Sequence, residues 1–174
     1  MIEVQITKEH LILAKHRAND LGILKNSIEK GQGNITGFLG EIIVAEYYGW
    51  EIKNSDSINY DYDLIYKNHK IDVKTKNRKV IPEENYFATV SDYNTKQICD
   101  YYFFVSIRNF EYAYLMGIIK KENFYKKAYF NNKGDYDKSS PSHFPFYFKA
   151  PCYNLEYSKL FNADKIKINV SQNI

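Results

Sequence analysis

A hairpin-like alternation of charged and apolar residues between Asp61 and Lys76 constrains the fold of this chain more than any other feature. The alternation continues on both sides of Asn68-His69, a pair suited to a two-residue turn. With that turn, residues whose numbers sum to 137 lie opposite each other on neighbouring strands. The opposed pairs are then Tyr66 with Ile71, Ile65 with Asp72, and Asp63 with Lys74.

The predicted hairpin has two chemically different faces, because side chains two residues apart on a strand share a face. The apolar face requires a core to contact. This separation survives a four-residue turn, but a three-residue turn would break it. The charged face carries Asp61, Asp63, Ile65, Asp72, Lys74 and Lys76, and the apolar face carries Tyr62, Leu64, Tyr66, Ile71, Val73 and Thr75.

Asp63, Asp72 and Lys74 are the residues of the charged face that can support chemistry. Two hard oxygen ligands can hold Mg²⁺ and leave coordination positions for water and a phosphate oxygen. A lysine beside them can orient or help deprotonate the attacking water, or neutralise charge developing on the phosphorane. The alternative is an ordinary cross-strand ion pair, in which the lysine compensates two neighbouring carboxylates.

These residues resemble the signature of the PD-(D/E)XK nuclease superfamily, in which an acid on one strand is followed by Asp or Glu, any residue, and Lys on the next. Asp63 corresponds to the first acid and Asp72-Val73-Lys74 to the D-x-K element, which gives D-x(8)-D-x-K in this chain. No proline precedes Asp63, at a position that varies widely in the superfamily. Asp61 shares the predicted face and is the alternative first acid, but the spacing favours Asp63.

Gly37-Phe38-Leu39-Gly40-Glu41 resembles the Gly-Glu element that members of this superfamily carry on an N-terminal helix, which makes Glu41 a further acid of the site. On a helix, Gly37, Glu41 and Ala45 share a stripe, so small residues beside the carboxylate allow close approach to another surface. Alternatively, the helix dipole stabilises a glutamate in the first turns, with no further role. The order of helix, Asp63 and D-x-K element matches the superfamily and favours a role in the site.

The resemblance covers residues 34–107 and implies an α/β chain with a restriction-endonuclease-like mixed sheet flanked by helices. It also implies Mg²⁺- or Mn²⁺-dependent hydrolysis of phosphodiester bonds, most naturally in DNA, with Asp63, Asp72 and Glu41 holding the ions and Lys74 assisting the water. The sequence does not decide whether the substrate is DNA or RNA, whether the enzyme is an endonuclease or an exonuclease, or whether the protein forms a homodimer. So do two other functions: a catalytically silent nucleic-acid-binding module of the same fold, and a nuclease subunit active only in a complex.

Periodicity predicts two helices before the first strand, at residues 7–28 and 35–48, separated by Gly31-Gln32-Gly33-Asn34. With 174 residues and no repeat or linker, the sequence predicts one domain spanning residues 1–174. Strands are predicted at residues 62–66, 70–76, 86–90, 101–107 and 112–119, followed by a helix at 121–127, a surface loop at 131–143, and short strands with a small helix near 157–161 between residues 144 and 170.

Basic residues are concentrated between Lys67 and Lys79, although the net charge of the whole chain is only +3. Six of them lie there against one acid, Asp72, a local excess that predicts binding of a nucleic-acid backbone. A solvated edge strand protected by lysines is the alternative. The predicted phosphate-binding residues are Lys67, Lys70, Lys76, Arg78 and Lys79.

Gln97-Ile98-Cys99-Asp100-Tyr101 is similar to the Q-x-x-x-Y element of the RecB-like and phage-exonuclease-like branches of the superfamily, which makes Gln97 an accessory candidate. Tyr101 begins a strongly apolar run and is predicted to pack in the core.

The remaining composition bears on the cellular environment. The two cysteines, Cys99 and Cys152, have neither CxxC nor metal-site spacing, which predicts a reducing compartment. No signal-like N-terminus and no run approaching the roughly 18–20 apolar residues of a membrane span is present, so we expect a protein of the cytoplasm without a membrane partner. Small size and richness in Asn, Lys and Tyr suggest a phage or mobile-element origin.

Overall fold

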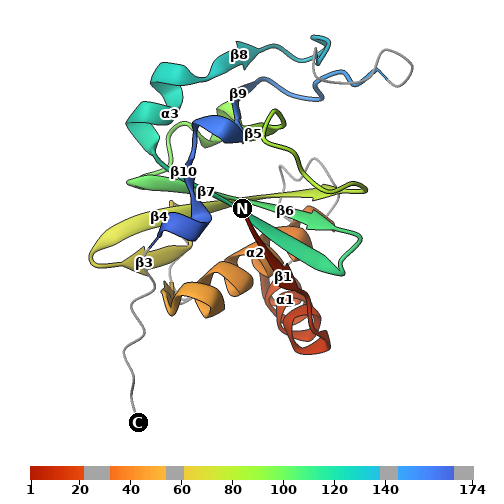
Figure 1. Ribbon diagram of the computed structural model, residues 1–174, viewed down its shortest axis with the longest axis vertical. Coiled ribbons are helices and arrows are strands. Elements are labelled where there is room, and N and C mark those ends of the chain that lie inside the picture. Colours follow the sequence, from red (N-terminus) through yellow and green to blue (C-terminus); the bar gives the residue numbers. More distant parts are fainter. Residues whose placement is uncertain (22–31, 54–60, 138–144, 167–174) are drawn as a thin grey trace.

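A mixed β-sheet runs through the centre of the molecule, with helices on one face and a smaller sheet on the other (Figure 1). The computed structural model describes residues 1–21, 32–53, 61–137 and 145–166. Within them the strand order is β1-β7-β6-β4-β3-β2, with β10 also paired to β7. β4 and β6 are parallel, whereas the other pairs are antiparallel. The strands are β1 (Ile2–Gln5), β2 (Glu51–Ile52), β3 (Leu64–Tyr66), β4 (His69–Arg78), β6 (Tyr101–Arg108), β7 (Tyr112–Lys120) and β10 (Phe161–Asn162).

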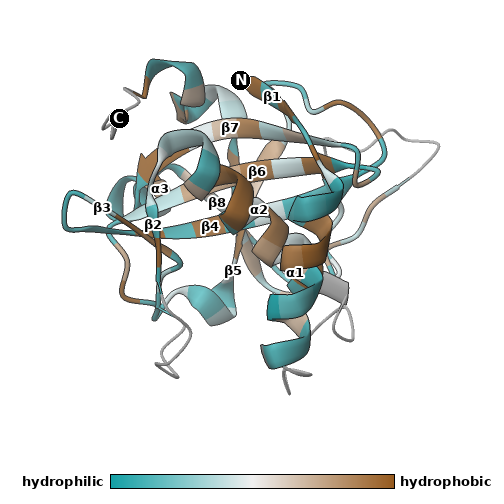
Figure 2. Cartoon of the chain, turned by 90° about the horizontal axis from the view of Figure 1, so that it is seen from below, coloured by the Kyte–Doolittle hydropathy of each residue, from teal (hydrophilic) through white to brown (hydrophobic). Residues whose placement is uncertain are grey.

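Two helices, α1 (Lys8–Leu21) and α2 (Gln32–Tyr48), cover the first face of this sheet (Figure 2). Leu39 of α2 is buried against the central strands, because alternate residues of β4 and β6, such as Val73 and Phe103, point to this side. Within the described residues, no helix combines the length and the apolar character needed to cross a membrane.

The opposite face of the central sheet packs against a small antiparallel sheet with the order β5-β9-β8 and against α3 (Figure 1). Tyr102 and Phe104 of β6 contact Phe124 and Leu155 there in a second buried cluster. The elements of this layer are β5 (Phe87–Ser91), α3 (Lys121–Lys127), β8 (Tyr129–Asn131) and β9 (Cys152–Glu156), with 3₁₀ helices η1 (Asp92–Asn94), η2 (Tyr157–Lys159) and η3 (Ala163–Lys165) nearby.

The structure confirms the mixed α/β class, the helix at residues 121–127, and the five predicted strands with ends shifted by at most two residues. It also confirms short strands and a helical turn near residue 157. The expectation that helices precede the first strand is wrong, because β1 pairs along the edge of β7. β1 was not predicted because its four residues are too few to show a periodic pattern, and its partner β7 lies far away in the sequence.

The boundaries of the predicted helices also change. α2 begins at Gln32, so the predicted break at Gln32-Gly33-Asn34 belongs to the helix. The first helix is described as far as Leu21, and residues 22–28 of its predicted range lie outside the described residues. The same holds for residues 138–143 of the predicted loop and 167–170 of the last stretch.

The turn of the β3–β4 hairpin lies one residue earlier than predicted, at Lys67-Asn68. Both turn residues have positive φ, 46° and 66°, as a two-residue type I′ turn requires. Leu64 therefore pairs with Ile71, opposed residue numbers sum to 135, and the predicted pairs, Asp63 with Lys74 among them, are wrong. Because the register moves by two residues, every side chain stays on its predicted face.

The α2 helix lies very close to β4 at Gly40. A Cβ atom added there would lie 2.0 Å from Oγ1 of Thr75 and 3.1 Å from its Cβ and Cγ2 atoms. Rotating the threonine side chain would move Oγ1 but would leave the 3.1 Å contact with Cβ, which is tighter than ordinary van der Waals contact. Gly37, which belongs to the predicted stripe of small residues, would meet no atom within 4 Å. Gly40 therefore sets the distance between helix and strand, and Gly37 does not.

Gly40→Ala should destabilise the folded protein by about 1–3 kcal/mol, the usual cost of overpacking a buried contact. Urea unfolding followed by circular dichroism measures this loss.

Gly37→Ala is the matched control, and it should be neutral or stabilising by up to about 1 kcal/mol, because alanine favours a helix over glycine. The double substitution Gly40→Ala/Thr75→Ala should recover part of the loss. Equal effects of the two single glycine substitutions would contradict the proposed role of Gly40.

Candidate active site

Asp63, the first acid of the predicted site, directly precedes β3. The backbone amide of Asp63 donates to the carbonyl of Ile71 at 2.9 Å, and its carboxylate Oδ2 accepts from the amide of Val73 at 2.7 Å. β3 begins only at Leu64, so it offers no backbone carbonyl to the Val73 amide. The Asp63 carboxylate accepts that hydrogen bond instead. Asp63 is thereby held beside Asp72, on the strand next to its own.

Lys74 lies between two partners on the same face as Asp72. Its Nζ lies 2.7 Å from Asp72 Oδ2 and donates to Gln97 Oε1 at 3.0 Å. Asp72 is only 2% exposed, and its Oδ2 has no hydrogen-bond donor of acceptable geometry among the described residues. Lys74 and Asp72 therefore form an ion pair whose angles do not suit a hydrogen bond.

Glu41 reaches this place from α2 and is buried. Its Oε2 lies 3.4 Å from Nη1 of Arg17 on α1, and the Arg17 guanidinium lies over the ring of Phe38, 4.8 Å from the centroid. The sequence analysis missed Arg17. A basic residue on the first helix carries no local signal of an ion pair with the second helix.

Glu41, Asp63 and Asp72 form what we call the acidic cluster. Burial raises the pKa of Glu41 to about 7; Arg17 and Lys74 oppose the rise and Asp72 adds to it. Burial, and then the charges of Glu41 and Asp72, raise the pKa of Asp63 well above its usual range. The cluster therefore holds protons at a pH where exposed carboxylates are ionised, and it favours additional positive charge.

The two accessory candidates have different surroundings. Gln97 lies in the cluster's neighbourhood, because its side chain accepts from Lys74. The carboxylate of Asp61 instead accepts from the amide of Ile98 at 3.1 Å, which anchors the segment that carries Gln97. Tyr101, predicted in the core, is half-buried and contacts the ring of His69.

Lys76 shares the face of Lys74, and its role as a phosphate contact stays a prediction, although its ammonium already has a partner in the small sheet. The small sheet covers this part of β4, and Lys76 Nζ donates to Thr89 Oγ1 of β5 at 2.6 Å. Burial lowers the pKa of Lys76 to about 8, with the charge of Arg78 adding to the effect. Arg78 also faces β5, where its Nη2 donates to the carbonyl of Phe87 at 3.3 Å.

The other predicted phosphate-binding residues lie apart from these two. Lys67 and Lys79 are exposed. Lys67 Nζ lies over the ring of Tyr66, and Lys70 Nζ over the ring of Tyr62, both near the hairpin turn. The basic stretch is thus divided between a buried layer and the hairpin surface. A role of Lys67, Lys70 and Lys79 in nucleic-acid binding stays a prediction.

Among the residues that the structure describes, no three His, Cys, Asp or Glu side chains converge closely enough to form a ready-made metal site. The chemistry of the donor set nevertheless suits a hard cation. Asp72 Oδ2 is a buried oxygen without a hydrogen-bond donor, and the pKa values of Glu41 and Asp63 are raised partly by neighbouring carboxylates. Mg²⁺ and Mn²⁺ bind carboxylate oxygens of this kind, whose negative charge the neighbouring side chains neutralise only in part.

Comparisons of the sequence with protein-family models and with curated proteins found no match.

Glu41→Gln should change how stability depends on pH. Below pH 4.5, the ordinary pKa, the carboxyl is protonated in both the folded and the unfolded state. Between pH 4.5 and about 7 the folded state binds more protons than the unfolded state, so stability falls as the pH rises. Glutamine cannot ionise, so the variant should become more stable than the wild type at pH 8, by roughly 3 kcal/mol.

Urea unfolding at a series of pH values from 4.5 to 8 measures this difference. Glu83→Gln, at an exposed position, is the control and should follow the wild-type curve. A Glu41→Gln curve parallel to that of the wild type would show that Glu41 ionises as easily as an exposed carboxyl.

Proposed function

We propose that this protein is a metal-dependent nuclease with a restriction-endonuclease-like fold, and that it hydrolyses phosphodiester bonds in DNA. The observation that carries the proposal is that Glu41, Asp63, Asp72 and Lys74, which come from three separate segments, lie within electrostatic range of one another. A structural ion pair needs one carboxylate and one lysine. Two buried carboxylates, Glu41 and Asp72, with the partly buried Asp63 beside them, raise the cost of folding, which function would explain.

Asp63 and Asp72, with Glu41 beside them, are the residues that would hold Mg²⁺ or Mn²⁺. When bound, the ion would supply Lewis-acid activation of the phosphate and of a water molecule. In the structure, Arg17 forms an ion pair with Glu41, and Lys74 forms one with Asp72.

Lys74 is the candidate catalytic residue of this chain. In the hydrolysis, the water oxygen forms a bond to phosphorus, the bond to the leaving alkoxide breaks, and the proton that the water loses is balanced by the proton that the alkoxide takes up to become an alcohol. Negative charge therefore increases on the phosphorane oxygens, and an ammonium group at this position stabilises it. Asp72 and Gln97 hold Lys74 Nζ from two sides, so they act as positioning residues for it.

Lys74→Ala should lower the rate of DNA cleavage by roughly 10²- to 10⁴-fold, the usual contribution of a positioned acid–base or charge-stabilising group. The assay uses linear, circular, single-stranded and branched DNA with Mg²⁺ or Mn²⁺. Lys8→Ala, which removes an exposed lysine of α1, is the control and should cleave at the wild-type rate.

Equal cleavage by wild type and Lys74→Ala would disprove the assignment of the site. DNA binding without cleavage by the wild type would favour the silent binding module. Cleavage that begins only when a partner protein is added would favour a subunit of a complex.

Metal binding can be tested without activity. Mn²⁺ at about 100 times its dissociation constant should stabilise the wild type by about 2.7 kcal/mol, because the ion binds only the folded state. Thermal unfolding with and without Mn²⁺ measures this as a rise in Tm. The rise should disappear in Asp72→Asn and persist in Asp61→Asn, and a rise of equal size in both variants would place the ion elsewhere.

A further inference from the structure

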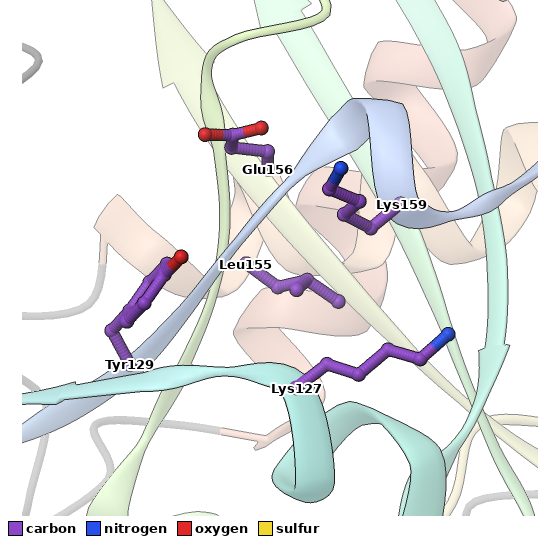
Figure 3. A pocket seen from close by; sticks show the side chains of 5 residues that line it. All are labelled: Lys127, Tyr129, Leu155, Glu156 and Lys159. Carbon is purple, nitrogen blue, oxygen red and sulfur yellow. The ribbon is translucent and has the colours of Figure 1, made fainter.

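A second feature of the molecule suggests how a nucleic-acid strand could be held away from the acidic cluster. It is a hollow of about 260 Å³ where the end of α3 meets β8, β9 and η2 (Figure 3). We call it the α3 hollow. In Figure 3 the side chain of Leu155 lies in the middle, with Tyr129 to its left, Lys127 below it and Lys159 above it. The lining residues are Lys127, Tyr129, Leu155, Glu156 and Lys159.

The α3 hollow combines an apolar floor with an aromatic wall. Leu155 is 2% exposed and packs into the core between the two sheets, so the floor is rigid. Tyr129 is 65% exposed, so its ring is accessible from solvent. A planar aromatic base can stack on such a ring, and stacking requires the base to be unpaired.

The rim of the α3 hollow is positively charged. Lys127 and Lys159 are exposed, and neither ammonium forms an ion pair or a hydrogen bond with any residue that the structure describes. The one acid, Glu156, accepts a hydrogen bond from the hydroxyl of Ser158 at 3.2 Å. Lys126 adds a further exposed charge on the last turn of α3. The α3 hollow thus has an exposed aromatic ring on one side and free lysines on the other (Figure 3). A base can stack on the ring while lysines contact the neighbouring phosphates.

α3 connects the α3 hollow to the candidate active site. At its start, Lys121 Nζ donates to the carbonyl of Gln97, whose side chain accepts from Lys74. At its end, Lys127 lines the hollow. Lys127 lies six positions after Lys121, which corresponds to roughly 9 Å along the helix axis.

Beside Lys121 lies a second hollow of about 460 Å³, which Cys99, Lys120 and Tyr125 also line. Asp100 and Glu122 line this second hollow as well, so acidic and basic side chains are mixed there. The segment from Lys120 to Lys127 contains four lysines and one glutamate.

We infer that the α3 hollow binds an unpaired base of a single-stranded DNA segment that extends from the active site. The base stacks on Tyr129 above Leu155, and the adjacent phosphates contact Lys127 and Lys159. The direction of the strand toward the acidic cluster rests on the proposed function, whereas binding at the hollow can be measured without cleavage.

The test measures binding of the full chain to a fluorescently labelled single strand in EDTA, where a metal-dependent enzyme does not cleave. Tyr129→Ala should weaken binding by roughly 5- to 100-fold, the range for loss of one base stacked on an aromatic ring. Lys127→Gln/Lys159→Gln should reduce the slope of log K against log salt by about 1.4, because about 0.7 is lost for each phosphate contact on a single strand.

Matched controls are Tyr147→Ala, which removes an exposed tyrosine elsewhere, and Lys8→Gln/Lys15→Gln, which removes two exposed charges from α1 on the other face of the main sheet. Both should bind like the wild type. Circular dichroism shows that each variant is folded.

The outcomes separate the two proposals. Unchanged affinity in Tyr129→Ala, or equal loss in Tyr147→Ala, would overturn the α3 hollow as a base-binding site. So would a duplex of the same sequence that binds as tightly as the single strand and loses affinity equally in Tyr129→Ala. Binding that depends on Tyr129, together with no cleavage under any metal condition, would support the hollow and count against the nuclease.

Discussion

The contact between α2 and β4 at Gly40 is the constraint on which the rest of the site depends. Only a residue without a Cβ atom lets the helix approach Thr75 at this distance. Glu41 follows Gly40 in the helix, and Lys74 precedes Thr75 in the strand, so the same close approach brings the helix carboxylate within electrostatic reach of the strand residues. Packing of the core and assembly of the acidic cluster therefore have one geometric cause.

The acidic cluster is costly to bury, and the structure offsets that cost in two ways. Arg17 pairs with Glu41, and Lys74 pairs with Asp72. Within the described residues, neither Arg17 Nη1 nor Asp72 Oδ2 forms a hydrogen bond, so these pairs act through charge. The raised pKa values of Glu41 and Asp63 let protons neutralise part of the remaining charge. A buried group of carboxylates with incomplete compensation lowers stability, and it is also the state from which a cation is bound most strongly.

The small sheet decides which basic residues can meet a ligand. It covers β4 beyond Lys74, so Lys76 and Arg78 support the contact between the two sheets. The lysines of α3 lie at the opposite end of the same layer and remain exposed, apart from Lys121. The layers therefore separate the cations into two groups: Lys76 and Arg78 form contacts between the sheets, and Lys126 and Lys127 stay exposed.

Sequence periodicity alone determined the two faces of the hairpin, the D-x-K pair on one of them, the helix at residues 121–127 and the mixed α/β class. These features depend on residues within a few positions of one another, where the periods of strand and helix act directly. Only the tertiary structure decided the turn at Lys67-Asn68, the role of Gly40, the ion pair of Arg17 with Glu41, the hydrogen bond of Lys74 to Gln97, and the hydrogen bond of Lys76 to Thr89. Each of the last four depends on contact between segments distant in the chain, for which local patterns carry no signal. The turn moved by one residue because the alternation specifies which face a side chain takes and leaves the register free in steps of two.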